Sequence, residues 1–210
     1  MSISAIITKF IQDFQLSTWQ EWVSTISQII SVYFAQKNSV LVYPTGMIGV
    51  LLAAWMYYFV ADPPLYADTV LNIYYFAMSI YGWYNWSLMK NQTHVFDASY
   101  ATKNELFIGL SGFVLSWAAL FFILKYLTNS NTPTADALVS ASAVIAMWWM
   151  ARRRIENWYA WIFSNLVAIP LNFYKGFMLF TAMYVIFLLM AIYGYLSWKR
   201  LIYSSPVTHE

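Results

Sequence analysis

Charged residues are scarce in this chain. Lys and Arg together number 11 and Asp and Glu number 9, so charged residues are 10% of the 210 residues, against about 25% in an ordinary soluble domain. So few charges cannot cover the water-facing surface of a soluble domain of this length. The shortage excludes an ordinary soluble enzyme, a disordered chain and a nucleic-acid-binding protein that works through basic charge.

Cysteine is absent and histidine is rare. Without cysteine the chain has no disulfide framework and no thiolate chemistry. His94 and His209 both lie in polar segments, which leaves no His/Asp/Glu cluster for a membrane enzyme that acts on lipid. The sequence has no Walker motif or other nucleotide-binding loop, so pumping by ATP would need a partner chain. We therefore predict a protein that is not an enzyme and that uses no cofactor or metal.

Apolar and aromatic residues are abundant instead. Hydrophobic residues make up 61% of the chain and aromatic residues 20%, and the mean hydropathy is +0.55. This composition is typical of a helical protein that crosses the lipid bilayer several times. Belts of aromatic residues at the two membrane interfaces account for part of the aromatic excess.

Seven stretches are long enough to cross a membrane. A helix that spans ~30 Å of hydrocarbon needs about 20 mostly apolar residues. The seven predicted spans are 18–36, 45–61, 67–89, 105–127, 134–150, 156–174 and 177–198. Asp62-Pro63-Pro64 forces a turn after the second span, and Thr134 is a suitable N-cap for the fifth.

Two parts of the chain depart from a plain apolar span. Residues 1–17 are apolar but contain Lys9 and Asp13, and we interpret them as an amphipathic segment at the membrane interface. The first span is the most polar of the seven. Lipid offers its polar side chains no partner, so they should face other helices or a cavity; they are Gln20, Glu21, Ser24, Ser27 and Gln28.

The basic residues indicate the orientation of the chain. Seven spans place Lys9, Lys125 and Lys175 on one side of the membrane. The other side then holds Lys37, Lys90, Lys103, Arg152, Arg153, Arg154, Lys199 and Arg200. Because cytoplasmic loops are enriched in Lys and Arg, the second side is predicted to be cytoplasmic. The N-terminus is then outside and the C-terminus inside.

A sequence repeat relates the two halves of the chain. Residues 80–86 and 192–198 have the same residue at four of seven positions, at a shift of 112, and residues 35–37 match 151–153 at a shift of 116. We predict two parallel three-helix repeats, 18–90 and 132–200, joined by a loop and linking helix at 91–131 and followed by a tail at 201–210. Parallel repeats of this kind occur in transporters whose site lies between the halves.

Two predicted spans present polar and aromatic residues on one face, because steps of three and four residues return to the same side of a helix. Stacked rings suit a flat cationic heteroaromatic solute, and amides and hydroxyls suit its polar groups. In the sixth span these residues are Trp158, Trp161, Asn165, Asn172 and Lys175. In the third span they are Asn72, Tyr75, Ser79, Trp83 and Trp86.

A purely structural interpretation of these residues stays open. Trp86, Trp158 and Trp198 lie near span ends, where interfacial tryptophan is normal, and Trp148-Trp149 fits the same belt. Asn72 and Asn165 could also serve hydrogen bonds between helices. The Met and Phe residues of the seventh span are interpreted as lipid-facing or packing residues.

Ionisable residues are predicted only near the ends of spans. Proton relays and sodium sites usually need a carboxylate or histidine within the membrane. The distribution therefore favours downhill uniport over transport coupled to an ion. A channel is the remaining transport alternative, and it would be recognised by flux that does not saturate.

The motifs resemble those of the PnuC family of bacterial vitamin transporters. The resemblance covers about residues 18–200 and depends on residues 81–86, on Glu156-Asn157-Trp158 with Trp161 and Asn165, and on Lys175-Gly176. It implies an all-α membrane fold of seven helices in a three-plus-one-plus-three arrangement, like a full-length version of the small SWEET sugar transporters. It also implies a homotrimer in the bacterial inner membrane.

The same resemblance implies a substrate and a partner. The best-known substrate of the family is nicotinamide riboside, taken up by facilitated diffusion and trapped inside by a cytoplasmic kinase. Members that carry nicotinamide riboside tend to have Gln at the positions of Asn72 and Lys175. In this chain 72–75 and 174–176 look closer to relatives proposed to carry thiamine. Nicotinamide riboside and thiamine therefore both stand as predicted substrates.

Overall fold

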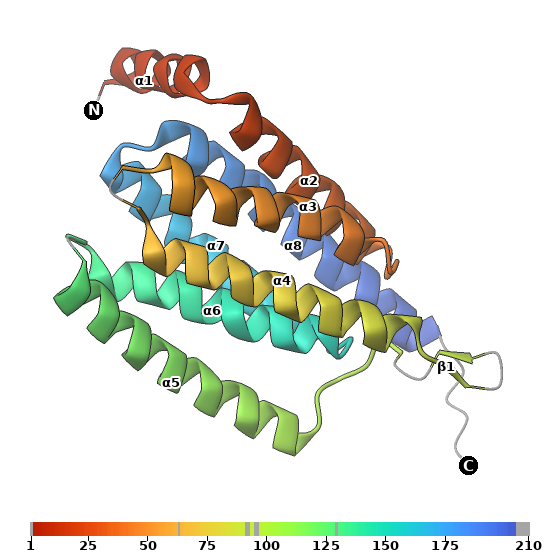
Figure 1. The fold of residues 1–210 in the computed structure, drawn as a ribbon. Helices are drawn as coiled ribbons and strands as arrows, with labels where there is room; N and C mark the ends of the chain where they lie inside the picture. Colours follow the sequence, from red (N-terminus) through yellow and green to blue (C-terminus); the bar gives the residue numbers. More distant parts are fainter. Residues whose placement is uncertain (1, 63, 91–92, 95–96, 129, 205–210) are drawn as a thin grey trace.

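The chain folds into a bundle of long helices (Figure 1). A computed structural model describes residues 2–62, 64–90, 93–94, 97–128 and 130–204. In chain order its elements are α1 (Ile3–Leu16), α2 (Trp19–Gln36), α3 (Val42–Trp55), the π-helix η1 (Met56–Val60), α4 (Tyr66–Ser87), the short strands β1 (Met89–Lys90) and β2 (Thr93–His94), α5 (Lys103–Leu127), α6 (Pro133–Ala151), α7 (Glu156–Lys175) and α8 (Met178–Ser204).

The helices from α2 to α8 occupy the predicted spans, with η1 continuing α3. Among the described residues, four helical segments are long and apolar enough to cross a membrane by length and composition: α3 with η1, α5, α6 and α8. Helices α2, α4 and α7 carry more polar and aromatic side chains, and several of these face inward. The overall architecture is an all-α bundle, as the composition predicts.

Local sequence signals explain most helix ends. Thr18 caps α2 and Thr102 caps α5, each in a capping box with the Glu three residues later. Gly176 ends α7 in the left-handed region at φ 78°. The predicted N-cap of the fifth span is wrong, because α6 begins at Pro133 and Thr132 holds the N-cap position. Proline is favoured in the first turn, where its missing N–H costs no hydrogen bond.

Helix α1 lies at the edge of the bundle, in contact with α8 and at an angle to α2 (Figure 1). None of its residues is buried. Its Asp13 accepts hydrogen bonds from the backbone N–H groups of Met178 at 2.8 Å and Leu179 at 3.3 Å, at the start of α8. A carboxylate from α1 thus satisfies the free N–H groups and complements the positive end of the α8 dipole.

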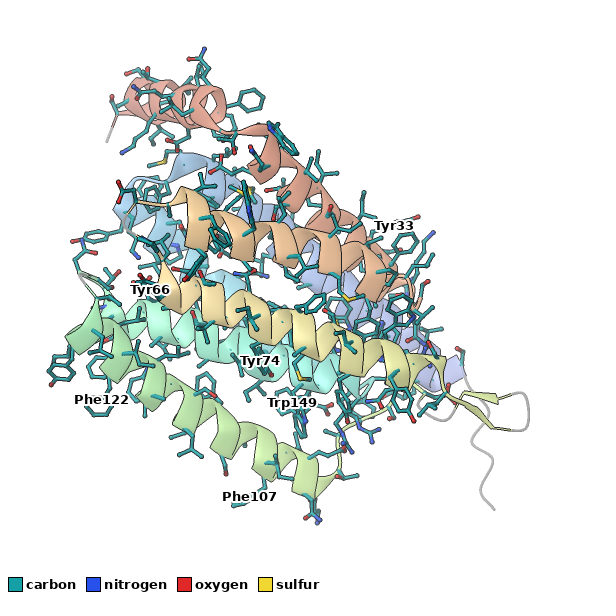
Figure 2. The ribbon with its side chains drawn as sticks, viewed as in Figure 1. Tyr33, Tyr66, Tyr74, Phe107, Phe122 and Trp149 are labelled. Atoms are coloured by element: carbon teal, nitrogen blue, oxygen red, sulfur yellow. The ribbon has the colours of Figure 1, made fainter. Side chains whose placement is uncertain are left out.

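Six helices pack in a closed order around a shared interior. Helix α2 packs on α3, α3 on α4, α4 on α6, α6 on α7, α7 on α8, and α8 returns to α2. Helix α5 packs against α6 at the edge of the bundle, where Gly109 gives space to the ring of Trp149 (Figure 2). The side chains of Phe107 and Phe122 lie on the outer face of α5.

Two tight corners have the same backbone geometry. Asn38 connects α2 to α3 with φ 52°, and Arg153 connects α6 to α7 with φ 54°. Around both residues the backbone repeats the same five hydrogen bonds at a constant shift of 115, for example from Asn38 N–H to the Ala35 carbonyl and from Arg153 N–H to the Met150 carbonyl. The shift of 116 read from the sequence is therefore wrong by one residue.

The change from a shift of 115 to one of 112 occurs in a single loop. The connection between η1 and α4 covers 61–65, whereas the one between α7 and α8 covers 176–177. The first connection is longer by three residues. The two shifts read from the sequence, 116 and 112, imply a difference of four residues, and this value is also wrong by one. The side chains around Asn38 and Arg153 are too different to align the two corners residue by residue. The shared pattern of backbone hydrogen bonds defines the alignment.

Removing the carboxylate of Asp13 should weaken the start of α8. We expect Asp13→Ala to lower the free energy of unfolding by about 1 kcal/mol, as for loss of a helix cap. Asp13→Asn keeps an acceptor oxygen and should lose less. Thermal unfolding of the purified protein checks this, with Asp62→Ala in the exposed loop before α4 as the matched control. Equal melting temperatures for Asp13→Ala and the control would contradict it.

Candidate functional site

A cavity of about 410 Å³ lies between the six packed helices. Its volume is in the range of pockets that hold small molecules. Side chains from α2, α3, η1, α4, α6, α7 and α8 line it. One end of the cavity lies where α2, α4, α6 and α8 begin. The other end lies near the corners at Asn38 and Arg153, where a layer of buried aromatic rings forms the floor of the cavity.

Helix α7 contributes a tryptophan and an asparagine to one wall. Trp161 and Asn165 both line the cavity, and Asn165 is only 4% exposed. Within the described part of the chain the Asn165 side chain makes no hydrogen bond, and the indole nitrogen of Trp161 is buried without one. The Asn165 amide is open to the cavity, so it can donate to and accept from a molecule that fills the cavity. The cavity is the place where a solute would supply a hydrogen-bond partner.

Helix α4 contributes a second polar wall. Asn72, Tyr75 and Ser79 all line the cavity. The Asn72 amide donates to the Asp68 carbonyl at 2.9 Å, and the Ser79 hydroxyl donates to the Tyr75 carbonyl at 2.8 Å. Both groups are satisfied within their own helix, so the acceptor oxygen of Asn72 and the lone pairs of Ser79 remain available to a ligand.

Trp158 forms part of the cavity floor. Its ring packs edge-on against Trp198 with centroids 5.6 Å apart, and Tyr43 packs edge-on against Trp86 at 5.1 Å. The rings of Trp86 and Trp198 join the two pairs at 5.8 Å. Trp86, Trp158 and Trp198 are at most 1% exposed, so the interpretation of these three as belt residues is wrong. Trp149 is also buried, against α5.

Hydrogen bonds fasten this floor to the ends of two helices. The Trp198 indole donates to the Ala35 carbonyl at 2.8 Å, and the Trp86 indole donates to the Met150 carbonyl at 3.1 Å. Each carbonyl already accepts a backbone N–H from the corner that follows, Asn38 to Ala35 and Arg153 to Met150, so each indole bonds to the second lone pair of the oxygen. Trp198 thereby joins α8 to α2, and Trp86 joins α4 to α6.

A buried arginine packs against the floor on the side that faces away from the cavity. The Arg153 guanidinium lies 4.4 Å from the ring centroid of Trp86 and 4.0 Å from the Asp97 carboxylate. Burial lowers the pKa of the Arg153 side chain, while nearby Tyr43 and Asp97 act in the opposite direction. The group stays charged at neutral pH because the ordinary value is so high, so its contact with Trp86 is a cation–π interaction.

Three residues of the predicted site do not line the cavity. Trp83 is 43% exposed on the outer side of α4. The Asn172 amide donates to the Ala168 carbonyl at 2.8 Å within α7. Lys175 pairs with Asp136 at 2.6 Å at the end of α7. Spacing shows which residues share a face of one helix, but it does not show what the neighbouring helices place against each of them.

The sequence analysis missed the contribution of α8. Phe180, Met183, Tyr184 and Phe187 line the cavity, although the Met and Phe residues of this span were interpreted as lipid-facing or packing residues. The repeat contained the signal that could have found them. Adding 112 to Asn72, Tyr75 and Ser79 gives Tyr184, Phe187 and Ala191 on α8, and all three line the cavity.

The polar residues of α2 are divided between the cavity and a helix contact. Glu21, Ser24 and Gln28 line the cavity, which confirms the expectation that they face inward. Ser24 donates to the Gly49 carbonyl at 2.9 Å, and Gln28 donates to Ser24 at 3.2 Å. These bonds join α2 to α3 while keeping polar atoms on the cavity wall.

A bundle of long apolar helices around a polar and aromatic cavity, closed at one end, defines a helical membrane transporter. The model of the nicotinamide mononucleotide transporter family matches residues 18–200. The chain belongs to this family, and it is a multi-pass membrane transporter and not an enzyme. The recognition of the PnuC family from the sequence motifs is confirmed.

Named relatives and a solved structure agree with this assignment. The chain is 25% identical to the riboflavin/roseoflavin transporter RibM of Streptomyces davaonensis over 86% of this chain and 84% of that protein. It is 24% identical to the nicotinamide riboside transporter PnuC of Escherichia coli over 86% and 85%, and 26% identical to PnuC of Neisseria mucosa over 96% and 78%.

The fold matches the crystal structure of the vitamin B3 transporter PnuC with a TM-score of 0.68 at 24% identity. The alignment covers 97% of this chain and 93% of the crystallised one. At this level of identity the comparison establishes a shared fold.

Two glycines make room for the rings of the floor. A Cβ atom at Gly194 would collide with the ring of Trp158, and one at Gly82 would collide with the ring of Tyr43. We expect Gly194→Ala to cost about 1–3 kcal/mol of stability through overpacking. Thermal unfolding checks this, with Gly112→Ala as control because its nearest neighbour, the flexible end of Ile145, would lie 3.1 Å away. A loss no larger than that of the control would show that the floor is loosely packed.

Proposed function

We propose that the protein moves a B vitamin with a cationic ring across the membrane by facilitated diffusion. Nicotinamide riboside is the first substrate we propose, and thiamine is the alternative. The unpaired Asn165 amide beside Trp161 in a closed-ended cavity is the observation that carries this proposal. One wall offers a ring for stacking and the other offers amide and hydroxyl groups, which suits a flat ring joined to a polar group.

The names of the relatives support a vitamin and leave its identity open. Relatives with similar identity to this chain are named for nicotinamide riboside and for riboflavin, so substrate varies within the family. Of the two positions that pointed toward thiamine, Asn72 lines the cavity, whereas Lys175 is paired with Asp136 outside it. Only Asn72 is therefore placed to distinguish the two vitamins by contact.

We also propose that the six packed helices are two parallel repeats of three. If α2, α3 and α4 correspond to α6, α7 and α8, every pair of helices that packs together corresponds to another pair that packs together. The same correspondence relates the Asn38 and Arg153 corners and the ring pairs Tyr43–Trp86 and Trp158–Trp198. Repeats at 18–90 and 132–200, with α5 as the linking helix within 91–131 and a tail at 201–210, are consistent with these equivalences.

The proposed membrane placement has seven crossing helices. Helices α2, α4 and α7 cross as well, since their polar side chains are turned toward the cavity and each other. Residues 1–17 lie at the outer interface, because the 14 residues of α1 extend only about 21 Å. The positive-inside rule places the floor and the Arg152–Arg154 corner on the cytoplasmic side of the bacterial inner membrane, with the N-terminus outside.

We propose alternating access as the mechanism, and a cavity that is closed at one end supports it. The floor rings would have to separate for a solute to leave on the cytoplasmic side, and the cavity would have to close at its other end. A channel needs no such closure, so the floor favours a carrier. A homotrimer, and a cytoplasmic kinase that traps the vitamin by phosphorylation, complete the proposal by analogy with the family.

Replacing the stacking ring should weaken substrate binding. We expect Trp161→Ala to lose about 1–3 kcal/mol of binding free energy, by analogy with loss of one stacked base. Calorimetry with nicotinamide riboside and thiamine on the purified protein measures this. Trp83→Ala is the matched control, because it removes the same ring from the outer face of α4. Equal losses for the two variants would remove Trp161 from the site.

Uptake should need no ion gradient. Vesicles that contain the protein are expected to equilibrate one of the two vitamins without a proton or sodium gradient, and to saturate with rising vitamin concentration. Strict dependence on either gradient would contradict uniport, and flux that fails to saturate would favour a channel. Failure to bind or move either vitamin would overturn the proposed substrate class.

A further inference from the structure

Two carboxylates line the wide end of the cavity. Asp68 lies in the first turn of α4 and Glu21 in the first turn of α2, and both are cavity-lining residues. Glu21 has a structural role, because its carboxylate accepts a hydrogen bond from the Thr18 N–H at 2.7 Å. Within the described residues the Asp68 carboxylate forms no ion pair and accepts no hydrogen bond from another residue, and the Asn72 amide is directed to its backbone carbonyl.

The nearest cation is already engaged. Lys175 is close enough to Asp68 to interact with it electrostatically, but its ammonium group is held by Asp136 at 2.6 Å. Asp136 also accepts hydrogen bonds from Ser130 at 2.7 Å and Thr132 at 3.0 Å. The pair of Asp136 and Lys175 is therefore neutral and structurally fixed, which leaves Asp68 and Glu21 as a net negative charge at the cavity mouth.

Three tyrosines share the cavity wall with Asp68. They are Tyr57 of η1, Tyr75 of α4 and Tyr184 of α8. Ring faces are the negative ends of aromatic quadrupoles and attract cations. Carboxylate and rings therefore act on a solute in the same direction.

A separate observation in the same cavity indicates a ligand. Asn165 is 4% exposed and makes no hydrogen bond with the described residues, and the Trp158 indole nitrogen is buried without a partner. Helix α4 begins and α7 ends at the mouth of the cavity. Counted at 1.5 Å per residue from those two helix ends, Asn165 lies about 12 Å deeper than Asp68. The carboxylate at the mouth and the unpaired groups inside thus lie along one path.

We propose that Asp68, assisted by Glu21, is the specificity-determining charge of this transporter, which admits cationic solutes and disfavours neutral and anionic ones of similar shape. This inference rests on the proposed function, because it concerns the substrate class of the same cavity. Low-dielectric walls focus the field of a charge along a cleft, so Asp68 acts on a ring cation without touching it.

Asp68 could instead have a structural role, because it lies in the first turn of α4. A carboxylate there stabilises the helix dipole whether or not it faces a cavity. Stability alone cannot distinguish the two roles, because both lose something when the charge is removed. Discrimination between a cationic and a neutral ligand of the same shape can, because a dipole role affects both ligands equally.

The test compares two forms of one ligand on the full chain in lipid nanodiscs. Nicotinamide riboside carries a positive ring, and its reduced dihydro form has nearly the same shape without the charge. We expect Asp68→Asn to raise the Kd of the cationic form about tenfold and to leave that of the neutral form unchanged. Thiamine provides a second cation for the same comparison. Asp62→Asn is the matched control, because it removes a carboxylate from the nearby loop.

Salt provides an independent readout. Binding of the cation to the unmodified protein should weaken as salt rises, and Asp68→Asn should reduce that dependence. If Asp68→Asn does not fold, Glu21→Gln takes its place, because glutamine preserves the capping box while removing the charge. It should shift the preference between the two forms in the same direction.

The possible outcomes separate the two proposals. Binding of neither vitamin by the unmodified protein overturns the proposed function together with this inference. Binding of a vitamin with an unchanged preference in Asp68→Asn, and in Glu21→Gln where it is needed, overturns the inference alone. A loss of preference with retained binding of the neutral form supports it, and restoration by Asp68→Glu identifies the charge as the cause.

Discussion

Lipid offers no hydrogen-bond partner, and this constraint accounts for where the polar groups of the bundle lie. Ser24 and Gln28 on α2 bond to each other and to α3, and Tyr74 donates from α4 to the Val144 carbonyl of α6 at 2.9 Å. Groups that find no such partner, chiefly Asn165, are left in the cavity. The same rule therefore produces both the helix contacts and the site.

The floor of the cavity combines packing with the pairing of helix ends. Trp86 and Trp198 fill the space between helices and donate to carbonyls of α6 and α2, and Gly82 and Gly194 provide the room that the neighbouring rings need. A seal built from discrete ring contacts and two hydrogen bonds can separate as a unit. In the proposed carrier, these are the contacts that would have to separate to open this end of the cavity.

The success of the sequence analysis differed between features for physical reasons. Span positions were predictable because ~20 apolar residues are needed whatever their neighbours are. Trp161 and Asn165 were found because their spacing puts them on one helix face. Trp83 and Lys175 were not excluded, since spacing on one helix does not say where the neighbouring helix lies. The register at Asn38 and Arg153 needed the hydrogen bonds, because their side chains differ.

The sequence by itself determined the class of protein, the approximate positions of the long helices and the polar residues available for a site. Its composition leaves water-soluble folds too little charge, and its motifs identify the family. Only the tertiary structure decided that Trp158 and Trp198 close one end, that α8 lines the cavity, and that Asp68 lies at the mouth without a partner residue. Those properties depend on which helix faces meet, and that depends on packing between residues more than 100 positions apart in the chain, such as Ala35 with Trp198 and Trp86 with Trp198.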